Sequence, residues 1–522
     1  MALNAAMVFE VRSTATAGNA NGGGFKTGSS GVDYSQQDAA QYSLTLVTTA
    51  AADAILLTSS ASADMVGNIA FISAGTNFTV GRYEIISVSV GVSITLDRTC
   101  TTAAGAAGVV AIGGALSLGS SDDAIFETLV AGNKMWIKGG SGPITYNLGG
   151  TVTIGASGSS ANVINIEGYA LTRGDKPLND TRPVLNAGAV TFTNGILIYW
   201  SNIAFTGTAA SVFTTNSYNN IISCKFTNTS ITADRVALTG KNNTFVFACE
   251  MISYRGSAFL SSGGTRYTVD SCYLHDSKAG ATHNSSALSC NYINNIFRNF
   301  TTNAIVCQGA STEEINIIRN TIHGCNNTGT AISFASGVQQ PHVYNNTISN
   351  FSVGISHSGV QVSQFDNYNN MFNNTTDVSA WVKGANDISI TPGFSISDVT
   401  GTNGTTSGNI LTSAGKDFTV LGVVAGRDFI YIVSGTGVTA GIYGITAVGT
   451  TTLTLDIAPG TSAVADKVYQ ISVGADFSVS TNLKATAYPG AFPGGYTTGY
   501  QDIGAVQRLE QGTGSGIPTV RL

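Results

Sequence analysis

"NNIISCKFTNTS", residues 219–230, contains the feature that decides the fold. Cys224 in this stretch is followed two residues later by the apolar Phe226. The same pair of residues returns every 23–26 positions, with Cys or Asn first and an apolar residue second. The first positions are Cys224, Cys249, Cys272, Asn295, Asn320, Asn346 and Asn370, and the second positions are Phe226, Met251, Leu274, Phe297, Ile322, Ile348 and Phe372. A fixed period of this length predicts a solenoid.

The apolar residues of the repeat distinguish between two kinds of solenoid. Leucine-rich repeats also place Asn or Cys shortly before an apolar residue. However, residues 219–375 contain only four leucines, and most apolar positions hold Ile, Val or Phe, which favour strands. No stretch with a helical period of 3.6 residues fills the rest of each repeat. The sequence therefore predicts an all-β fold with a parallel β-helix.

The first positions of the repeat are expected to form a structural ladder, the name used below for this column of residues. Coils of a β-helix stack at about 4.8 Å, so equivalent residues align along the axis. An Asn amide can bond the ladder residues above and below it and the bending backbone beside it. Cys has a similar volume and is stable when buried. The ladder is thus interpreted as structural and not as a chemical site.

Two further segments of the chain resemble each other. "GTNFTVGRYEIISV" (75–88) matches "GTGVTAGIYGITAV" (435–448), and "SITLDR" (93–98) matches "TLTLDI" (452–457). Apolar and polar residues alternate in both, which predicts half-buried strands joined by glycine turns. We expect two copies of one small β-sandwich or barrel-like module, at about 40–114 and 402–474.

These patterns predict four parts of the chain. Residues 1–118 form an N-terminal region with the first module, and residues 119–400 form the β-helix. Residues 401–474 form the second module, and residues 475–522 form a closing coil and the C-terminal tail. The second module is expected to be an insertion, because "TPGFSISD" (391–398) and the segment after 475 look like two parts of one coil.

Composition excludes several classes of protein. Charged residues make up 10% and hydrophobic residues 43% of the 522 residues, which argues against disorder. The net charge of −6 argues against nucleic acid as the main partner. The beginning of the chain, "MALNAAMVFEVRS", lacks the features of a signal peptide, and no run of 18 apolar residues predicts a membrane span. The seven cysteines lack CxxC spacing, so free thiols and no metal or other cofactor are expected.

Several stretches carry a resemblance to a known family. They are "SDDAIFETLVAGNKMWIKGG" (121–140), "INIEGY" (164–169), the repeated "NNT" turns and "FPGGYTTGYQDIGAVQR" (492–508). Residues 120–400 and 475–508 resemble right-handed parallel β-helix, pectate-lyase-like virion proteins of tailed bacteriophages. The resemblance implies a structural virion protein, either a tail spike or fibre or a head decoration, which is assembled in the host cytoplasm. It also implies other virion proteins as partners, a trimeric homo-oligomer and contact with a host-surface glycan.

Two alternatives stay open beside the structural virion protein. One is a receptor-binding tail spike that binds or depolymerises a glycan, as a polysaccharide lyase or a glycoside hydrolase. The other is a bacterial surface adhesin. Exposed aromatic residues beside polar columns would favour a glycan-binding function. No nucleophile, zinc or phosphate-binding motif supports an enzyme.

The best polar constellation lies three positions past the ladder. His275, Arg298 and His323 are expected to form a short column there, with Glu250 and Asp276 nearby. These five residues are the weak catalytic candidates, because glycan hydrolysis uses paired carboxylates. The alternative interpretation is an ordinary solvated face. Two acidic pairs were also considered: Glu313–Glu314, which needs a loop to form one site, and Asp122–Asp123, which is expected at a helix start.

Overall fold

The computed structural model describes most of the chain. It covers residues 3–477 and Ala505, except positions 5, 17–19, 120–123, 128, 149–151, 155–156, 178–180, 233, 264–265, 285–288, 309–313, 326 and 360–363. The described part is almost entirely β structure, with one short helix, α1 (Ala124–Glu127), and one 3-10 turn, η2 (Ala63–Met65). The chain divides into two compact units, residues 1–225 and 226–522, and the expected closing coil after 477 lies outside the described residues.

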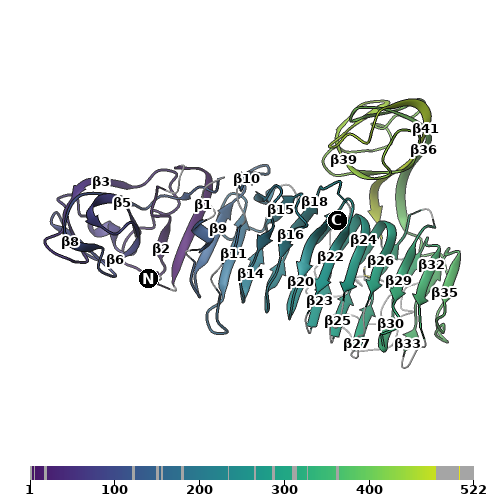
Figure 1. Ribbon diagram of the computed structural model, residues 1–522, viewed down its shortest axis with the longest axis horizontal. Coiled ribbons are helices and arrows are strands. Elements are labelled where there is room, and N and C mark those ends of the chain that lie inside the picture. The colour runs from purple at the N-terminus through teal and green to yellow at the C-terminus, as the bar shows by residue number, and fades with distance from the viewer. Residues whose placement is uncertain are drawn as a thin grey trace, which may run out of the picture. The chain divides into compact units, whose positions relative to one another are not determined.

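The first unit contains solenoid coils with two sheets, which are parallel except for one antiparallel pair at an edge (Figure 1). One sheet has the order β2-β1-β9-β11-β14-β17, formed by Gly24–Lys26, Met7–Thr16, Lys134–Lys138, Ile164–Tyr169, Ile198–Ser201 and Asn220–Ile222. The other contains β10 (Thr145–Asn147), β12 (Val184–Asn186), β13 (Phe192–Thr193), β15 (Ala204–Gly207) and β16 (Ser211–Thr214). The expected strands "MWIKGG" and "INIEGY" correspond to β9 and β11.

The solenoid begins earlier than its repeat predicts. β1 pairs in parallel with β9, with Phe9 opposite Met135 and Val11 opposite Ile137. Residues 7–16 therefore belong to the solenoid and not to a separate N-terminal region. A single strand has no period of its own, which is why the sequence pattern does not reveal it. The first module thus lies between β1 and the solenoid strands that begin with β9.

The first module is a six-stranded, nearly closed antiparallel sheet. Its order is β3-β8-β5-β6-β7-β4, formed by Tyr42–Val47, Thr101–Ile112, Ile69–Phe78, Gly81–Ser89, Ser93–Leu96 and Ile55–Leu57. A bridge between Thr48 and Leu57 joins the two outer strands. Leu56, Ile72, Ile85 and Ile94 fill its core and are fully buried.

The second unit repeats the two-sheet arrangement. Its long sheet has the order β20-β23-β25-β27-β30-β33, formed by Thr244–Phe247, Arg266–Asp270, Ser289–Ile293, Glu314–Ile318, Gln340–Tyr344 and Phe365–Asn367. The second sheet contains β19 (Val236–Gly240), β21 (Glu250–Ser253), β22 (Ser257–Ser262), β24 (Tyr273–Asn284), β26 (Ile296–Cys307), β28 (Thr321–His323), β29 (Thr330–Phe334), β31 (Thr347–Ser349), β32 (Val353–His357), β34 (Asn370–Phe372) and β35 (Thr376–Ser379). β18 (Lys225–Asn228) lies at the boundary between the units.

The second module is a closed barrel that follows these coils in the chain. Its strands are β36 (Ser395–Ser407), β37 (Ile410–Ser413), β38 (Phe429–Ser434), β39 (Gly441–Val448), β40 (Thr452–Leu455) and β41 (Ser462–Asp476). They follow the order β36-β41-β38-β39-β40-β37 around the barrel, which is the order of the first module strand for strand. The barrel extends beyond the expected 401–474 because β36 and β41 pair along most of their length, from Ser395 opposite Asp476 onward.

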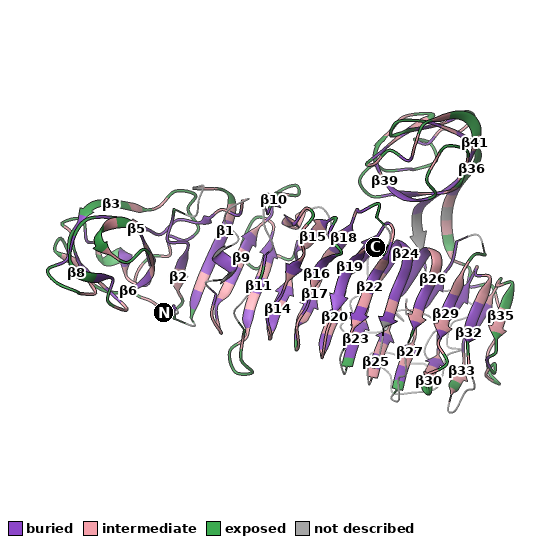
Figure 2. Ribbon diagram, in the orientation of Figure 1, coloured by how far each residue is buried: buried purple, intermediate pink, exposed green. Residues whose placement is uncertain are grey.

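The solenoid interior is packed with the apolar residues that alternate along each strand (Figure 2). A sharp bend connects the long sheet to the second sheet in every coil. The bend residue has a positive φ of 52–60° in all seven coils of the repeat, at Ser223, Ala248, Ser271, Asn294, Arg319, Asn345 and Tyr368. The left-handed conformation is uncommon for residues with a side chain, so surrounding contacts must hold it in place. The described helices include none with the length and apolar character needed to cross a bilayer.

Candidate functional site

The ladder residues lie directly after these bends and are bonded from coil to coil. The backbone N–H of Asn295 donates to Oδ1 of Asn320 at 2.9 Å, and that of Asn320 donates to Oδ1 of Asn346 at 2.8 Å. Cys272 forms the equivalent, weaker contact, because its Sγ accepts the N–H of Cys249 at 3.4 Å. The Asn side chains are fully buried. Each one therefore satisfies backbone groups at a bend that has no regular ladder of sheet bonds.

The column differs from the expectation at its last member. The N–H of Asn346 donates to Oδ1 of Asn369 at 3.0 Å, and Asn369 follows the bend residue Tyr368. Asn370 lies one position further along and bonds Ile390. Both asparagines precede an apolar residue by two places, so the sequence pattern alone does not show which of them is the ladder residue. The strand register identifies Asn369 as the ladder residue, because Met371, two places after it, pairs with Ile348.

The five catalytic candidates lie on the second sheet of the second unit. Strand register places His275, Arg298 and His323 opposite one another on β24, β26 and β28. His275 Nδ1 lies 2.6 Å from Oδ2 of Asp276, and its Nε2 lies 3.2 Å from Oε1 of Glu250. The structure thus brings the candidates together into one cluster, called the polar cluster below.

The barrel covers this polar cluster. Arg298 Nη2 forms an ion pair with Oδ1 of Asp398 on β36 at 3.0 Å. Asn299 donates to both Asp276 and Ser472, the latter on β41. His275, Asp276, Arg298 and His323 are all less than a tenth exposed. A polymer therefore has no access to the cluster in this arrangement.

The pKa values of the two histidines move in opposite directions. Burial lowers the pKa of His275, but hydrogen bonds to Asp276 and Glu250 and their charges outweigh it, so the pKa lies above its ordinary value. Burial, with a smaller contribution from the charge of Arg298, lowers the pKa of His323 to about 3. His323 is consequently neutral near pH 7. Its ring contacts those of Phe394, which directly precedes β36, and Phe477, which directly follows β41, and these two rings also contact each other.

Tyr254 and Cys325 extend the contact between the barrel and the coils. The hydroxyl of Tyr254 donates to Oδ2 of Asp456 at 2.7 Å. The thiol of Cys325 lies 2.8 Å from Oε1 of Gln470, a residue that also bonds Asp398. A small apolar cluster accompanies these bonds, with Ile252 and Tyr254 from the coils and Phe429 and Ile442 from the barrel. This geometry is that of an internal interface, and it differs from an open catalytic groove.

A second, open site lies on the outward face of the long sheet in the same unit. Residues four positions before the ladder form an outward column, called the face column below. Its members are Phe245, Thr268, Asn291, Asn316, His342 and Phe365, paired in this order by strand register. Asn316 donates to Oδ1 of Asn291 at 2.9 Å, and Nδ1 of His342 lies 3.1 Å from Oδ1 of Asn316. Polar side chains thus occupy the middle of the column, and an aromatic ring occupies each end.

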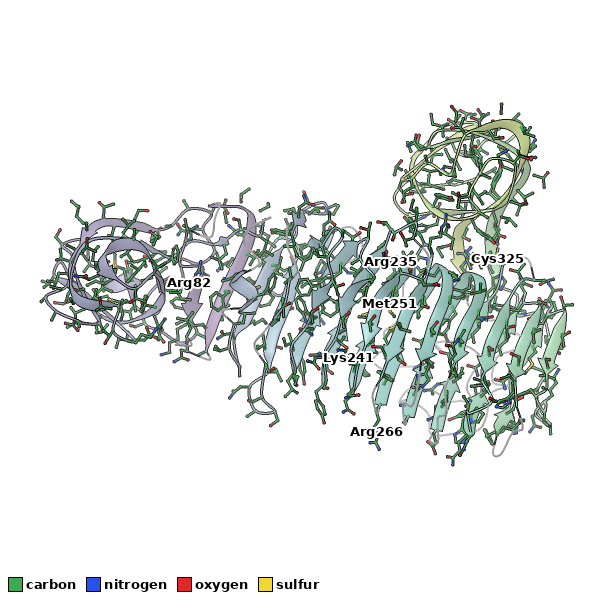
Figure 3. The ribbon with its side chains drawn as sticks, viewed as in Figure 1. Arg82, Arg235, Lys241, Met251, Arg266 and Cys325 are labelled. Atoms are coloured by element: carbon green, nitrogen blue, oxygen red, sulfur yellow. The ribbon has the colours of Figure 1, made fainter. Side chains whose placement is uncertain are left out.

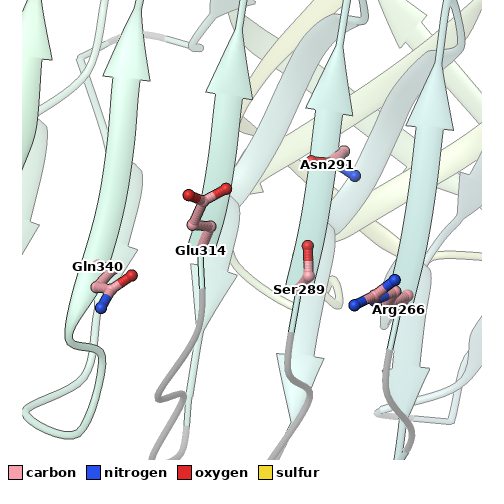
Figure 4. A pocket seen from close by; sticks show the side chains of 5 residues that line it. All are labelled: Arg266, Ser289, Asn291, Glu314 and Gln340. Carbon is pink, nitrogen blue, oxygen red and sulfur yellow. The ribbon is translucent and has the colours of Figure 1, made fainter.

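A pocket of about 460 Å³ opens beside the face column (Figure 4). Arg266, Ser289, Asn291, Glu314 and Gln340 line it, from four successive strands. Four of these residues stand six positions before a ladder residue. Of the lining residues, only Glu314 is among the sequence-based candidates, although the six-residue offset from the ladder marks four of the five. Glu313, and likewise Asp122 and Asp123, lie outside the described residues.

Among the described residues, no group of three or more His, Cys, Asp or Glu side chains could hold a metal ion. The seven cysteines are all buried and unpaired by disulfides.

Comparisons with known proteins give weak likenesses. No family model matches the chain, and no curated protein matches it. Among solved structures, the PL6 family polysaccharide lyase Pedsa3628 from Pseudopedobacter saltans has a TM-score of 0.28 at 12% identity, covering 52% of this chain and 91% of the lyase. The tailspike protein gp49 from Pseudomonas phage LKA1 has a TM-score of 0.18 at 9% identity, with 84% and 83% coverage. The tailspike gp61 of Pseudomonas phage phi297 has a TM-score of 0.16 at 12% identity, with 83% and 81% coverage. Scores this low carry no argument about function.

Proposed function

We propose that this chain is a β-helical rod that contacts glycans on a host surface, as a tail spike or fibre of a phage particle does. The face column supports the glycan contact. It combines amide, hydroxyl and imidazole groups with aromatic rings at Phe245 and Phe365. The second part of the proposal, that the chain belongs to a phage tail, comes from the sequence resemblance.

The chemistry of the face column suits a sugar chain. Sugar hydroxyls exchange hydrogen bonds with side-chain amides such as those of Asn291 and Asn316. The apolar C–H faces of sugar rings pack against aromatic rings. Phe365 is 40% exposed, and Phe245 lies parallel to Phe247 with ring centroids 6.0 Å apart. Coils spaced at about 4.8 Å repeat these groups along the axis, as an extended polymer requires.

The polar cluster supports a structural function for the second sheet. Arg298 of the cluster forms an ion pair with Asp398 of the barrel, and Asn299 links Asp276 of the cluster to Ser472 of the barrel. The open pocket contains one described carboxylate, Glu314, whereas hydrolysis of a glycan usually requires two. We therefore propose binding without cleavage.

The proposal is tested by measuring glycan binding of two double variants, each of which replaces a matched pair of asparagines. Asn291→Ala combined with Asn316→Ala is expected to weaken binding of the intact chain to host capsule or lipopolysaccharide at least about tenfold, through loss of several hydrogen bonds. The control is Asn147→Ala combined with Asn186→Ala. These residues form the same side-chain bond, at 2.8 Å, on an outward column of the other sheet in the first unit.

Equal affinity of both double variants for the glycan would contradict the assignment of the face column as the contact surface. Release of oligosaccharides by the wild-type chain would instead support a depolymerase. Electron microscopy of phage particles labelled with an antibody to this chain tests the second part of the proposal. Labelling of tails is the expected result, and the absence of any labelled particle would contradict it.

A further inference from the structure

The pocket beside the face column contains two opposite charges that are free to meet a ligand. Arg266 at the start of β23 and Glu314 at the start of β27 are both exposed. No ion pair or hydrogen bond of either side chain occurs among the residues that the structure describes. Figure 3 shows Arg266 at one end of the solenoid strands, away from Cys325 at the contact with the barrel. The pocket and the polar cluster are thus separate sites.

The strand register places these charges in one row across the sheet. Arg266 pairs with Ser289 on β25, and Glu314 pairs with Gln340 on β30. β27, which begins at Glu314, is the strand next to β25. Figure 4 shows Ser289 between the two charges. Along the solenoid axis the pocket therefore presents a cation, a hydroxyl, an anion and an amide.

The distance between the two charges restricts the ligand. Two strand spacings separate the backbones of Arg266 and Glu314, which is about 10 Å. A charged hydrogen bond at each end takes about 2.8 Å, so about 4 Å remains between the anion and the cation of a ligand that joins both side chains. The same spacing is close to one disaccharide, so an extended glycan places equivalent sugars at both charges. A ligand that suits the pocket therefore carries a negative and a positive charge on the same repeating unit.

A substituent of a sugar must keep both charges after it is attached. An amino acid loses its negative charge when its carboxyl group is esterified, and its positive charge when its amine is acylated. A phosphodiester of an amino alcohol keeps both, and two carbon atoms give about the required separation. The guanidinium of Arg266 binds phosphate through two parallel hydrogen bonds. A primary ammonium donates hydrogen bonds to the oxygens of Glu314, Ser289 and Gln340.

The lining of the pocket distinguishes a primary from a quaternary ammonium. Proteins bind quaternary ammonium groups with aromatic rings. None of the described residues that line this pocket is aromatic, and the rings of the face column, Phe245 and Phe365, stand at its two ends. The carboxylate, hydroxyl and amide oxygens of the pocket accept hydrogen bonds, which a quaternary ammonium has no N–H group to donate. The pocket is therefore suited to a primary ammonium.

We infer that the pocket binds a zwitterionic substituent of a glycan, a phosphodiester that carries a primary ammonium, as in phosphoethanolamine. The phosphate lies on Arg266 and the ammonium on Glu314. This inference rests on the proposed glycan contact and specifies its ligand. The sugars that carry the substituent lie along the neighbouring face column, on Asn291 and Asn316.

Three small phosphodiesters test the ligand on the full chain by NMR titration: glycerophosphoethanolamine, glycerophosphocholine and glycerophosphoglycerol. The first carries a primary ammonium, the second a quaternary ammonium and the third no cation. We expect the first to bind at least about threefold more tightly than the other two, a modest factor because solvent and salt screen exposed charges. Equal or tighter binding of either of the others would overturn the inference.

Exchange of the two charges separates recognition of a zwitterion from a general charge effect. Arg266→Glu and Glu314→Arg each leave two like charges in the pocket, and each weakens binding of glycerophosphoethanolamine about three- to tenfold. The double variant carries the same two charges in reversed order, so the ligand binds in the opposite orientation and the affinity returns to near the wild-type value. The control is Lys278→Glu, at an exposed pair with Asp234 on the other sheet, which leaves the affinity unchanged.

A double variant that binds no better than the single variants would contradict the zwitterionic ligand. A loss caused equally by Lys278→Glu shows a non-specific charge effect and overturns the assignment. The source of the ligand is tested with one oligosaccharide, with and without a phosphoethanolamine group, and with vesicles of phosphatidylethanolamine. Tighter binding of the substituted oligosaccharide is expected. Binding to the vesicles without a preference between the two oligosaccharides would assign the pocket to a lipid headgroup and overturn the glycan substituent.

The outcomes also separate this inference from the proposed function. If glycerophosphoethanolamine does not bind while the Asn291 and Asn316 double variant loses affinity for host glycan, the ligand assignment is wrong and the glycan contact stands. If glycerophosphoethanolamine binds as expected while that double variant keeps full affinity for host glycan, the zwitterion site stands and the face column is not the glycan contact.

Discussion

Replacing Asn320 by Leu tests whether the ladder stabilises the solenoid. Oδ1 of Asn320 accepts the N–H of Asn295 at 2.9 Å and its side-chain amide at 3.1 Å. Nδ2 of Asn320 donates to the carbonyl of Tyr292 at 2.8 Å and to Oδ1 of Asn346 at 3.0 Å. Asn295 and Asn346 keep further side-chain bonds, to Val269 and Ile317, but the buried N–H of Asn295 loses its acceptor.

The expected cost follows from this inventory. One buried donor left without a partner costs about 1–3 kcal/mol, and the other lost bonds contribute about 1 kcal/mol in total after new apolar burial by Leu is considered. We expect Asn320→Leu to lower the free energy of unfolding by about 2–4 kcal/mol. Because the entropy of unfolding grows with chain length, at about 2 cal/mol/K per residue, each kcal/mol lowers the unfolding midpoint of this 522-residue chain by about 1 °C.

The matched control is Asn320→Cys, because the chain itself uses Cys at this position in earlier coils. The Sγ of Cys272 accepts the N–H of Cys249, so a thiol at 320 retains a weak acceptor for Asn295. Calorimetry, together with hydrogen exchange of the Asn295 amide, measures both variants. An unchanged midpoint for Asn320→Leu, or an equal loss for Asn320→Cys, would refute the reasoning.

Two predictions concern the contact between the barrel and the coils. Asp398→Asn leaves Arg298 buried without its anion and should loosen the contact of the barrel with the coils. Alkylation of the Cys325 thiol, measured by thiol-mapping mass spectrometry, should then become at least about tenfold faster. The control Asp234→Asn, at the exposed pair with Lys278, should leave the rate unchanged, and equal rates in the two variants would contradict the interface. The pKa of His323 is lowered to about 3, so the stability linked to its neutral form is present above pH 6.5 and is lost as pH falls toward 3. The free energy of unfolding of His323→Gln should therefore fall less on acidification than that of the wild type, with a difference of up to about 1.4 kcal/mol per pH unit in this window. Parallel curves of the unfolding free energy against pH for the two proteins would show that His323 does not titrate there.

The sequence predicts those features that repeat along it. The ladder period identifies an all-β solenoid, and the second copy of the "GRYEIISV" pattern identifies two related modules. The same period also contains the pocket, because Arg266 and Glu314 each stand six positions before a ladder residue. The polar cluster lies on the other side of the ladder, three positions after it, so the two sites occupy opposite flanks of the same repeat.

Features that depend on contacts between distant segments were not predictable in the same way. The repeat places His275, Arg298 and His323 in register, but the burial of the polar cluster depends on Asp398, a hundred residues away from Arg298. Residues 7–16 form a single coil strand, and one strand shows no repeat. Periodicity thus predicts the scaffold, whereas the surface that the barrel covers is determined by tertiary packing.

The two modules share a contact in which a guanidinium group covers a tyrosine ring. In each, a tyrosine hydroxyl bonds a threonine carbonyl four residues earlier, Tyr83 to Thr79 at 2.8 Å and Tyr443 to Thr439 at 2.6 Å. A guanidinium covers the ring of each tyrosine, and in the first module this is the module's own Arg98, 4.3 Å from the ring centroid.

The second module has Ile457 where the first has Arg98, so it lacks this cation. Arg255 from the solenoid lies 4.9 Å from the Tyr443 ring centroid instead. A Cβ at Gly441 would lie 1.2 Å from a guanidinium nitrogen of Arg255, so this approach requires glycine. A cation over a tyrosine ring stabilises by about 0.5–2 kcal/mol, more when it is buried. The same contact that is internal to the first module therefore joins the second one to its coils, and it adds to the contacts of Arg298, Tyr254 and Cys325 that hold the barrel over the polar cluster.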